Sequence, residues 1–309
     1  MKILFASHTG VYTGGAEKSM LHLISHAMKN NNVIVNIPDG NQQYYKILKE
    51  NKINVSRVLK DKDKSKYGGF FQLNLFKKIV RRIIYVIKFC FFLNEKKPDV
   101  VYLNTIRTSS ELIACKIMNV STVMHLRGFD DKSNLRNFLL RFCDVVIVLN
   151  NYAKKIVNKN GKKNNVIVIA NGTPIKQLKT KKFDYKELNF CTIGPYNYRK
   201  GTDHLYYFLK SLIQNKINFK YHHFGKVDPE DLFSENYLKK IKQLKFDYVE
   251  HGYLKNDSVI SHLEKMQFMV LCSRKEGLSR AFLESIERGV IPILSKISEH
   301  KELMHDKGC

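Results

Sequence analysis

The chain has 309 residues, of which 44% are hydrophobic, so it can bury a sizeable core and is long enough for two domains. Its six cysteines include no CxxC pair and no regular spacing, which argues against a zinc site or a disulfide framework and favours a reducing compartment. The formal net charge of +25 points to anionic partners, but no nucleic-acid-binding motif accompanies it, so nucleic acid is not an expected partner.

The first predicted element is a short apolar strand at residues 2–7, which is far too brief for a signal peptide and predicts a cytoplasmic protein. A loop with Gly10, Gly14 and Gly15 follows, and after it apolar side chains recur at helical spacing from Met20 to Ala27. Bare glycines between a strand and a helix let backbone N–H groups approach an anion, although glycine pairs also serve as plain tight turns. The loop therefore has both an anion-binding and a purely structural interpretation.

Short apolar runs alternate with amphipathic stretches along the whole chain, which predicts an α/β fold of strand–helix units around parallel sheets. A turn at 171–174 and a lysine-rich stretch interrupt this pattern, so we place a first domain at 1–175, a linker at 176–188 and a second domain at 189–309. A helix is expected at 201–215. The expected strands are 2–7, 33–37, 99–103, 122–126, 144–149 and 166–170, then 189–193, 219–224, 248–253, 268–272 and 291–294.

Residues 76–93 mix five Lys and Arg side chains with many large apolar ones, and their longest uncharged apolar runs are only five residues. A membrane span needs roughly 20 apolar residues, so this segment is not one. It is either a helix that packs on the sheet of the first domain or a basic amphipathic helix that rests on an anionic membrane. AT-rich coding bias can also produce a lysine excess, but residues 1–175 carry a net +18 and residues 176–309 only +7.

Two loops of the second domain combine charges in a way that suits a nucleoside diphosphate. Residues 194–201 follow a strand and include the adjacent cations Arg199 and Lys200, which can stabilise a departing diphosphate, although lysines at helix starts are usually just solvated. The strand at 268–272 leads into a loop with Glu276, and Glu284 follows one to two turns along the next helix. Open α/β sheets bind ligands at the carboxyl ends of their strands, where a carboxylate can accept hydrogen bonds from both hydroxyls of a ribose.

In their order and separations, these motifs resemble glycosyltransferase family 4, a group of retaining GT-B enzymes. The resemblance extends over nearly the whole chain. The matching elements are Gly14-Gly15-Ala16-Glu17, His125-Leu126-Arg127-Gly128, Asn171-Gly172, Arg199-Lys200-Gly201 with Asp203, His251-Gly252-Tyr253, and Glu276 and Glu284 with Gly289 and Pro292. It implies two Rossmann-like doubly wound parallel-sheet domains facing across a cleft. It also implies transfer of a sugar, with retention, from a nucleotide sugar to a growing cell-surface glycan such as lipopolysaccharide, O-antigen or capsule.

The resemblance assigns roles to individual residues. His125 and Glu276 are implied to be catalytic, and Glu17 and Arg127 are implied to lie on the acceptor side. No cofactor and no metal are expected, because the family generally needs none and Asp61-Lys62-Asp63 is only a lexical match to a metal-binding DxD. The residues implied to bind the donor are Gly14, Gly15, Arg199, Lys200, Gly277, Leu278, Ser279 and Glu284.

The implied partners are a nucleotide sugar, a glycan or lipid-linked acceptor, and the anionic inner surface of the cell membrane, at which a cytoplasmic protein would be peripheral. The basic first domain suits such a surface. A nucleotide-sugar epimerase on the same scaffold is an alternative, against which the Arg199–Lys200 and Glu276–Glu284 pattern argues. A basic nucleic-acid-binding protein is a further alternative, but no sequence motif supports it.

Two features depart from the family pattern. Pro195 stands where similar enzymes commonly carry an arginine directly after the glycine that matches Gly194, and Arg199 is expected to supply the missing charge. The chain also stops at Cys309, where relatives continue with several further helices. The second domain is therefore expected to be incomplete, and an inactive truncated remnant is another alternative.

Overall fold

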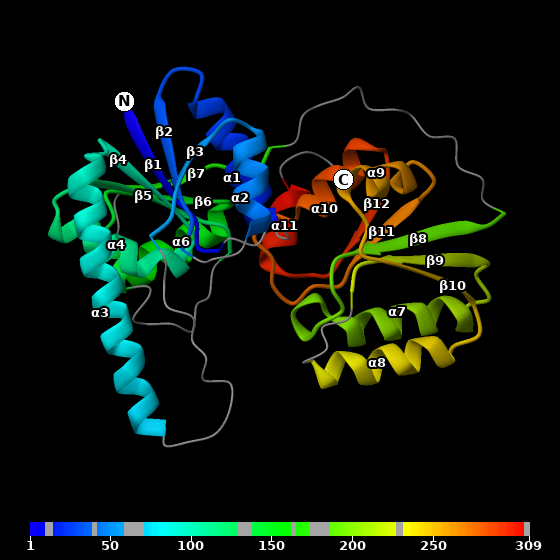
Figure 1. Cartoon of the computed structure of the whole chain (residues 1–309). Helices are drawn as coiled ribbons and strands as arrows, with labels where there is room; N and C mark the ends of the chain where they lie inside the picture. Colours follow the sequence, from blue (N-terminus) through cyan, green and yellow to red (C-terminus); the bar gives the residue numbers. More distant parts are fainter. Residues whose placement is uncertain are drawn as a thin grey trace. The chain divides into compact units, whose positions relative to one another are not determined.

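The chain folds into two compact units, Met1–Ala170 and Asn171–Cys309. A computed structural model describes residues 1–9, 15–38, 42–58, 71–128, 138–161, 165–172, 186–226 and 231–305. Each unit has a parallel sheet of its own with helices packed on it (Figure 1). The sequence places the end of the first domain at residue 175, and most of the predicted linker, 176–188, lies outside the described residues.

The sheet of the first unit has seven parallel strands in the order β3-β2-β1-β4-β5-β6-β7. The order reverses between β1 and β4, and such a switch point is where open parallel sheets bind ligands. The strands are β1 (Lys2–Ala6), β2 (Asn32–Asn36), β3 (Asn54–Ser56), β4 (Val100–Asn104), β5 (Ser121–Leu126), β6 (Val145–Val148) and β7 (Val166–Val168).

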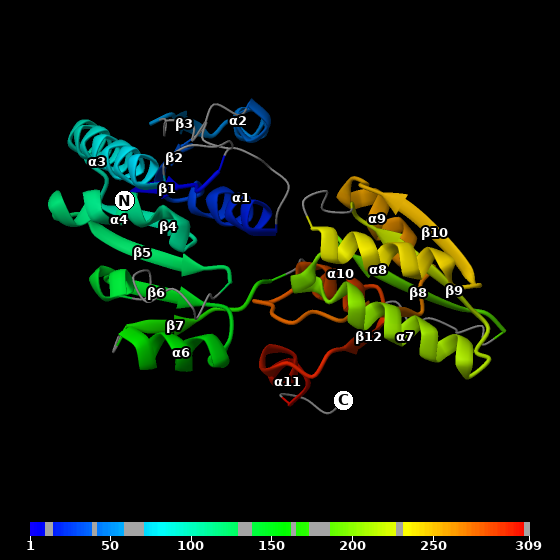
Figure 2. The same ribbon diagram turned by 90° about the horizontal axis from the view of Figure 1, so that it is seen from below.

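Helices cover both faces of this first sheet, as Figure 2 shows. Phe5 of β1 shares a buried cluster with Met20 of α1, whereas its neighbour Leu4 shares another with Phe89 of α3 and Leu112 of α4. Successive strand residues point to opposite faces, so consecutive apolar residues are what a sheet buried on both sides requires. The helices are α1 (Gly15–Ala27), α2 (Gln42–Glu50), α3 (Phe71–Lys96), α4 (Ser109–Ile117) and α6 (Asn151–Gly161), with 3₁₀ turns at Ile106–Thr108 and Leu140–Phe142.

The sheet of the second unit has five parallel strands in the order β10-β9-β8-β11-β12, with a switch point between β8 and β11. The strands are β8 (Leu188–Ile193), β9 (Phe219–Phe224), β10 (Asp247–Gly252), β11 (Phe268–Leu271) and β12 (Ile291–Leu294). The helices are α7 (Thr202–Gln214), α8 (Leu232–Gln243), α9 (Asn256–Leu263), α10 (Arg280–Glu287) and α11 (Ser298–His305), and Tyr198–Lys200 form a 3₁₀ turn.

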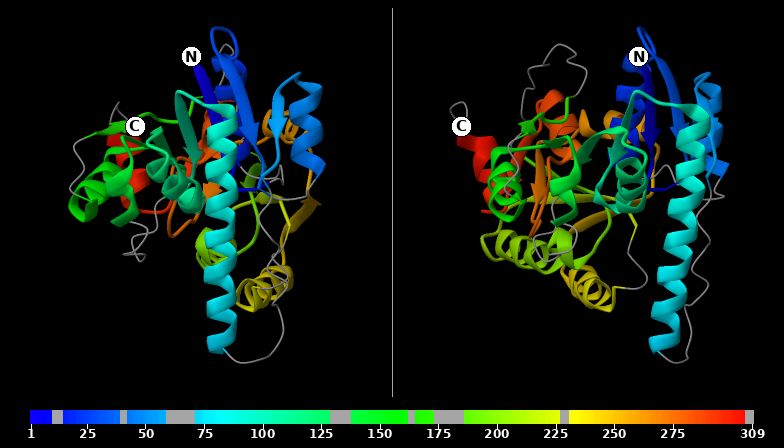
Figure 3. Two further views of the ribbon diagram at one scale, coloured as in Figure 1. Left: turned by 60° about the vertical axis from the view of Figure 1, so that its left-hand side comes forward. Right: turned by 90° about the vertical axis from the view of Figure 1, so that its left-hand side faces the viewer.

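The predicted α/β class, the doubly wound parallel sheets and every predicted strand are confirmed. The sequence missed β3 (Asn54–Ser56), because this three-residue edge strand carries a single apolar side chain. Residues 76–93 fall within α3, whose N-terminal half extends past the strands of its unit (Figure 3). Within the described residues, no helix combines the length and the apolar character needed to cross a membrane.

Candidate functional site

The two charged loops predicted from the sequence come together at the switch point of the second sheet. Strands β8 and β11 are direct neighbours, with Phe190 opposite Phe268, so the loops that follow their carboxyl ends are adjacent. After β8 the chain turns at Gly194 and enters the 3₁₀ turn that carries Arg199 and Lys200. After β11 it enters the loop that carries Glu276.

Gly201 allows the first loop to lie directly against the end of β11. Its φ is +69°, and a Cβ atom at this position would lie 2.0 Å from the carbonyl oxygen of Cys272. A side chain is therefore excluded both by the backbone conformation and by the space. Asn197 fixes the same turn, because its side-chain oxygen accepts a hydrogen bond from the backbone N–H of Lys200 at 2.8 Å.

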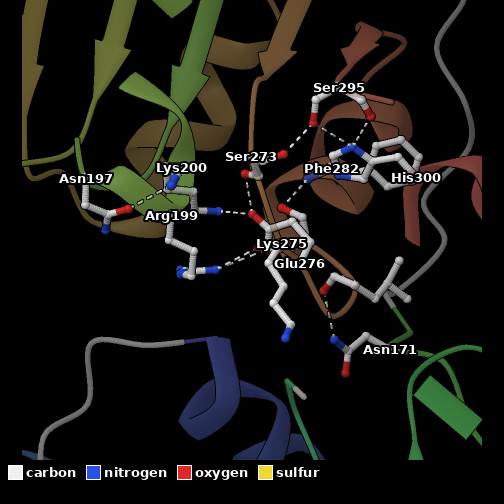
Figure 4. Close-up of polar contacts among 12 residues, drawn as sticks. Asn171, Asn197, Arg199, Lys200, Ser273, Lys275, Glu276, Phe282, Ser295 and His300 are labelled. Carbon is white, nitrogen blue, oxygen red and sulfur yellow. Dashed lines mark hydrogen bonds and ion pairs between the residues drawn. The ribbon is translucent and has the colours of Figure 1, made fainter. Parts of the chain in front are cut away.

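Glu276 is the centre of a polar cluster at this point (Figure 4). Lys200 Nζ donates to Glu276 Oε1 at 2.5 Å, and Ser273 Oγ donates to the same oxygen at 2.6 Å. Arg199 Nη1 lies 3.6 Å from Glu276 Oε2 and donates to the carbonyl oxygen of Lys275 at 3.4 Å. Only 7% of the Glu276 side chain is exposed, against 18% for Lys200 and 55% for Arg199.

The Glu276 carboxyl is ionised despite its burial. Burial alone would raise its pKa, but the charges of Lys200 and Arg199 and the hydrogen bonds from Lys200 and Ser273 outweigh that effect and lower the pKa below its ordinary value. Two cations and one carboxylate leave the cluster with an excess of positive charge. The cluster can therefore attract a further anion.

A second ion pair clamps the two loops together. Arg274 Nη2 and Nη1 donate to the two carboxylate oxygens of Asp203, at 2.5 and 2.8 Å, and Nη1 also donates to the carbonyl oxygen of Tyr198 at 2.7 Å. The guanidinium stacks over the Tyr198 ring at 4.0 Å, and the backbone N–H of Arg274 donates to the carbonyl oxygen of Arg199 at 2.9 Å. Bidentate geometry restricts the orientation of the two side chains relative to each other. The ion pair and the contacts of Arg274 with the turn therefore fix the position of the turn that bears Lys200.

In the sequence, the N-terminus of α10 follows closely after Glu276. Ser279 is its N-cap and accepts a hydrogen bond from the backbone N–H of Phe282. Leu278 offers its carbonyl oxygen to Asn171 Nδ2 at 3.2 Å, which ties the predicted Asn171–Gly172 turn to this loop. Helix N-termini favour anions, as the predicted role of residues 277–279 requires.

Glu284 lies on α10 and is 8% exposed, with Oε1 3.5 Å from Arg280 Nη2. The structure therefore places Arg199, Lys200, Glu276, Ser279 and Glu284 in one unit, on the loops and the helix around one switch point. Residues of both loops, including Gly194, Pro195, Lys200 and Ser273, line a pocket there that is partly open to solvent.

His125 and Arg127 lie in the first unit, at the carboxyl end of β5. The register pairs Asn104 with His125 and Tyr102 with Val123, so Tyr102, Asn104 and His125 share one face of the sheet. Tyr102 is hydrogen-bonded through its hydroxyl to His125 Nδ1, and Arg127 Nη2 donates to the Tyr102 oxygen at 3.3 Å. Arg127 Nε also donates to Asn104 Oδ1 at 3.2 Å.

This network assigns the tautomer of His125. A guanidinium can only donate, so the arrangement that satisfies all three groups has the Tyr102 hydroxyl donate to Nδ1 and leaves the proton of the imidazole on Nε2. Burial raises the pKa of Tyr102 to about 12, which keeps its hydroxyl protonated. Burial, and then the charge of Arg127, lowers the pKa of His125 to about 3. His125 is thus a neutral donor, and its buried Nε2 has no hydrogen-bond partner among the described residues.

The remaining predicted residues are at the start of the first unit. Gly14 lies outside the described residues, and Gly15 is the first residue of α1. Glu17, in the first turn of α1, is 3% exposed and has Oε1 3.5 Å from His8 Nε2. Asp61 and Asp63 also lie outside the described part of the chain, within which no group of three or more His, Cys, Asp or Glu side chains is arranged to hold a metal ion.

Sequence reasoning missed Tyr102, Ser273 and the contacts of Arg274. A tyrosine within an apolar strand has the pattern of a core residue, and no local signal distinguishes Tyr102 from one. Ser273 had a signal, because it follows a strand directly and precedes Glu276 by three residues. The partners of Arg274 depend on long-range pairing of β8 with β11, which the local sequence does not contain.

Residues 173–308 match the family model described as "Glycosyl transferases group 1". No curated protein matches the sequence. Among solved structures, HepE from Anabaena in complex with UDP is similar, with a TM-score of 0.76 and 20% identity over 98% of this chain and 83% of that chain. The apo lipopolysaccharide outer core galactosyltransferase WaaB gives a TM-score of 0.72 and 17% identity over 95% and 80%. A glycosyltransferase from Rickettsia africae ESF-5 gives 0.74 and 15% over 99% and 82%.

These likenesses extend over both units and show that the chain has the GT-B fold of glycosyltransferases. The family match covers only residues of the second unit. That unit contains the Arg199–Lys200 turn, the Glu276 loop and Glu284.

Proposed function

We propose that the chain transfers a sugar, with retention at the anomeric carbon, from a nucleotide sugar to a growing cell-surface glycan such as lipopolysaccharide, O-antigen or capsule. The observation that carries this proposal is the Arg199–Lys200–Glu276 cluster, because it sets an excess of positive charge at the ligand-binding edge of the unit that matches the group 1 transferase model. HepE, which has a similar fold, is in complex with UDP, and WaaB is a lipopolysaccharide galactosyltransferase.

In the proposed reaction, an acceptor hydroxyl oxygen forms a bond to the anomeric carbon of the donor sugar. The bond from that carbon to the diphosphate oxygen breaks, its electron pair leaves with the nucleoside diphosphate, and the hydroxyl proton passes to the departing phosphate. Negative charge therefore grows on the diphosphate. Preplaced cations stabilise this charge more strongly than that of the bound substrate.

Lys200 and Glu276 have different roles in this stabilisation: Lys200 contacts the diphosphate, and Glu276 holds the Lys200 side chain in position. An ammonium group has three N–H donors, and Glu276 holds one of those of Lys200 at 2.5 Å. The remaining donors are available to diphosphate oxygens, with the side chain already restricted by its partner. Arg199 supplies the second charge in the place of the arginine that Pro195 replaces, and the two cations supply charge that a metal ion would otherwise provide, so we propose transfer without a metal.

We also propose a role for each of the other predicted residues. Backbone N–H groups of Gly14, Gly15 and residues 277–279 bind donor oxygens, and Glu284 binds the hydroxyls of the ribose. His125 donates a hydrogen bond from Nε2 to the reacting sugar, and Arg127 and Glu17 lie on the acceptor side. We place the reaction in the cytoplasm at the inner face of the cell membrane, where a lipid-linked acceptor is accessible.

A screen of radiolabelled UDP-, GDP- and ADP-sugars with glycan and lipid-linked acceptors tests the proposal. We expect acceptor-dependent incorporation from one nucleotide class, unchanged by a metal chelator, and calorimetric binding of the matching nucleoside diphosphate. Glu284→Gln should weaken that binding, because ribose contacts exist in both ground and transition states. Sugar interconversion without any acceptor would indicate an epimerase instead, and failure of all three nucleoside diphosphates to bind would contradict the donor site.

A further inference from the structure

Helix α3 carries apolar side chains on two opposite faces, and the described residues of its unit bury only one of them. Tyr85 and Phe89 are 3% and 0% exposed and belong to the core. Ile79, Ile83, Ile87 and Phe91 are 48%, 54%, 51% and 73% exposed, and they recur at every fourth residue. At about 100° per residue, this stripe lies roughly opposite Tyr85 and Phe89. We call these four residues the outer stripe.

Helix α3 is much longer than the strands that it packs on. At 26 residues, α3 is about 39 Å long at 1.5 Å per residue, whereas the five-residue strand β4 spans only about 17 Å. The N-terminal half of the helix therefore extends past the sheet (Figure 3). None of the residues 77–84 is buried. A helix that is apolar on opposite sides normally has a partner on each side.

The charges beside the outer stripe indicate which partner this is. Residues 71–94 include Lys77, Lys78, Arg81, Arg82 and Lys88 but no Asp or Glu, and the first acidic residue, Glu95, pairs with Lys96. Lys77, Arg82 and Lys88 are exposed. Lysine is depleted from protein–protein interfaces, whereas helices that rest on anionic membranes combine large apolar residues with many Lys and Arg.

We propose that α3 docks the chain on an anionic lipid surface. The outer stripe enters the boundary between headgroups and acyl chains, and the exposed Lys77, Arg82 and Lys88 extend to lipid phosphates on either side. This docking needs no sugar-transfer activity, although it would bring the proposed site to a lipid-linked acceptor. The docking rests on the membrane location in the proposed function, but it can be measured without any sugar transfer.

Vesicle flotation of the full chain tests the proposal, with phosphatidylcholine vesicles compared with vesicles that also contain phosphatidylglycerol. We expect the protein to float with the anionic vesicles at low salt and much less at high salt, since lipid charge is screened within about 10 Å at 0.1 M. Ile83→Asp should lower the partition coefficient about tenfold or more, because it removes a large apolar side chain from the contact and adds a repelled charge.

Two matched controls separate the helix face from general charge and hydrophobicity. Ile117→Asp makes the same change at a residue of α4 that is 64% exposed, and it should leave flotation unchanged. Lys88→Glu should weaken flotation, whereas Lys155→Glu, an equal charge change on α6, should have little effect. All four side chains are exposed, so thermal melts should show folded proteins.

Several results would overturn the docking proposal. They are equal flotation with neutral vesicles, no flotation at all, and equal losses in the variants and their controls. Sedimentation velocity without vesicles can give one further contradicting result. If the chain self-associates and Ile83→Asp abolishes this self-association, the outer stripe contacts a second copy of the chain instead of a lipid surface. Nucleoside diphosphate binding is measured on the same samples, so a failed donor site and a failed docking helix give different results.

Discussion

The ion pair with Glu276 restricts the side chain of Lys200 before the proposed donor diphosphate binds. Lysine has a flexible side chain, and restricting it costs conformational entropy that ligand binding would otherwise have to supply. Glu276 holds the ammonium at 2.5 Å, and Ser273 and Arg199 hold the carboxylate in turn. The cluster is thus fixed before the anion arrives, which is the condition for effective electrostatic stabilisation.

We predict that Lys200→Ala lowers kcat/KM for the donor by about 10²–10³, on the order of 3–4 kcal/mol of lost transition-state stabilisation. Steady-state kinetics with the donor identified by the screen measure this effect. The control is Lys210→Ala, which removes an exposed lysine from α7 and should leave the rate unchanged. Normal turnover by a folded Lys200→Ala protein would remove Lys200 from the proposed mechanism.

Tyr102→Phe should allow both neutral tautomers of His125 while it keeps the aromatic packing. The ring of Tyr102 contacts Phe5, with 4.9 Å between centroids, and a phenylalanine preserves this contact. The hydroxyl that links Arg127 to His125 is lost, so the imidazole can exchange its proton between Nδ1 and Nε2. We predict a changed ¹⁵N NMR signal of His125 and a kcat lower by about tenfold, the cost of roughly one hydrogen bond, with little change in KM.

Tyr85→Phe is the matched control for Tyr102→Phe. Tyr85 is a buried tyrosine of the same unit, and its hydroxyl donates to Glu111 Oε1 at 2.8 Å. This variant should lose stability without altering the His125 signal or the ratio of kcat to KM. An unchanged ¹⁵N signal in Tyr102→Phe would show that Tyr102 does not determine the tautomer.

Among the elements, the turn between β8 and α7 depends on one glycine. We predict that Gly201→Ala lowers the free energy of unfolding by at least about 2 kcal/mol, since the left-handed backbone and the 2.0 Å approach of Cys272 oxygen both oppose a methyl group. It should also weaken donor binding, because Arg199 and Lys200 directly precede it. Denaturant unfolding and calorimetry with the nucleoside diphosphate measure the two effects.

Gly252→Ala is the control for the Gly201 prediction, because Gly252 has a φ of +64° but no atom within 4 Å of its would-be Cβ. It should lose only about 1 kcal/mol, the conformational cost of a left-handed alanine. The difference between the two variants isolates the contact with β11. Equal losses would mean that this contact contributes nothing to the position of the turn.

The elements that the sequence predicts well are those with a local signal. Central strands of the first sheet, such as β1, β2 and β4, are buried on both faces, so their residues are mostly apolar in succession. Arg199, Lys200 and Glu276 follow strand ends, where ligands bind. The edge strand Asn54–Ser56 has no such run. The contact of Tyr102 with His125 arises from the register of β4 on β5, in residues 23 positions apart, so the residues that fix the tautomer could not be predicted from the pattern.

For the whole molecule, buried neutral histidines predict acid lability. Burial, and then Arg127, lowers the pKa of His125 to about 3, and burial lowers that of His223 to about 4 despite its hydrogen bond to the Gly194 carbonyl oxygen. An unfolded histidine titrates near 6.5. Between this value and the folded pKa, the unfolded chain binds more protons than the folded one. The free energy of unfolding should therefore fall as the pH decreases from about 6.5.

Each such histidine contributes up to about 1.4 kcal/mol per pH unit below pH 6.5. The carboxyls with lowered pKa lose their contribution only as the pH falls below their ordinary values near 4, so measurements from pH 6.5 to 4.5 report mainly the histidines. These carboxyls include Asp144, Asp203, Asp231 and Glu276. In denaturant unfolding across this range, His223→Gln should show a shallower pH dependence than the native chain. His26→Gln, at an exposed position on α1, should keep the native slope. Parallel curves for all three proteins would show that burial of His223 in neutral form does not couple folding to pH.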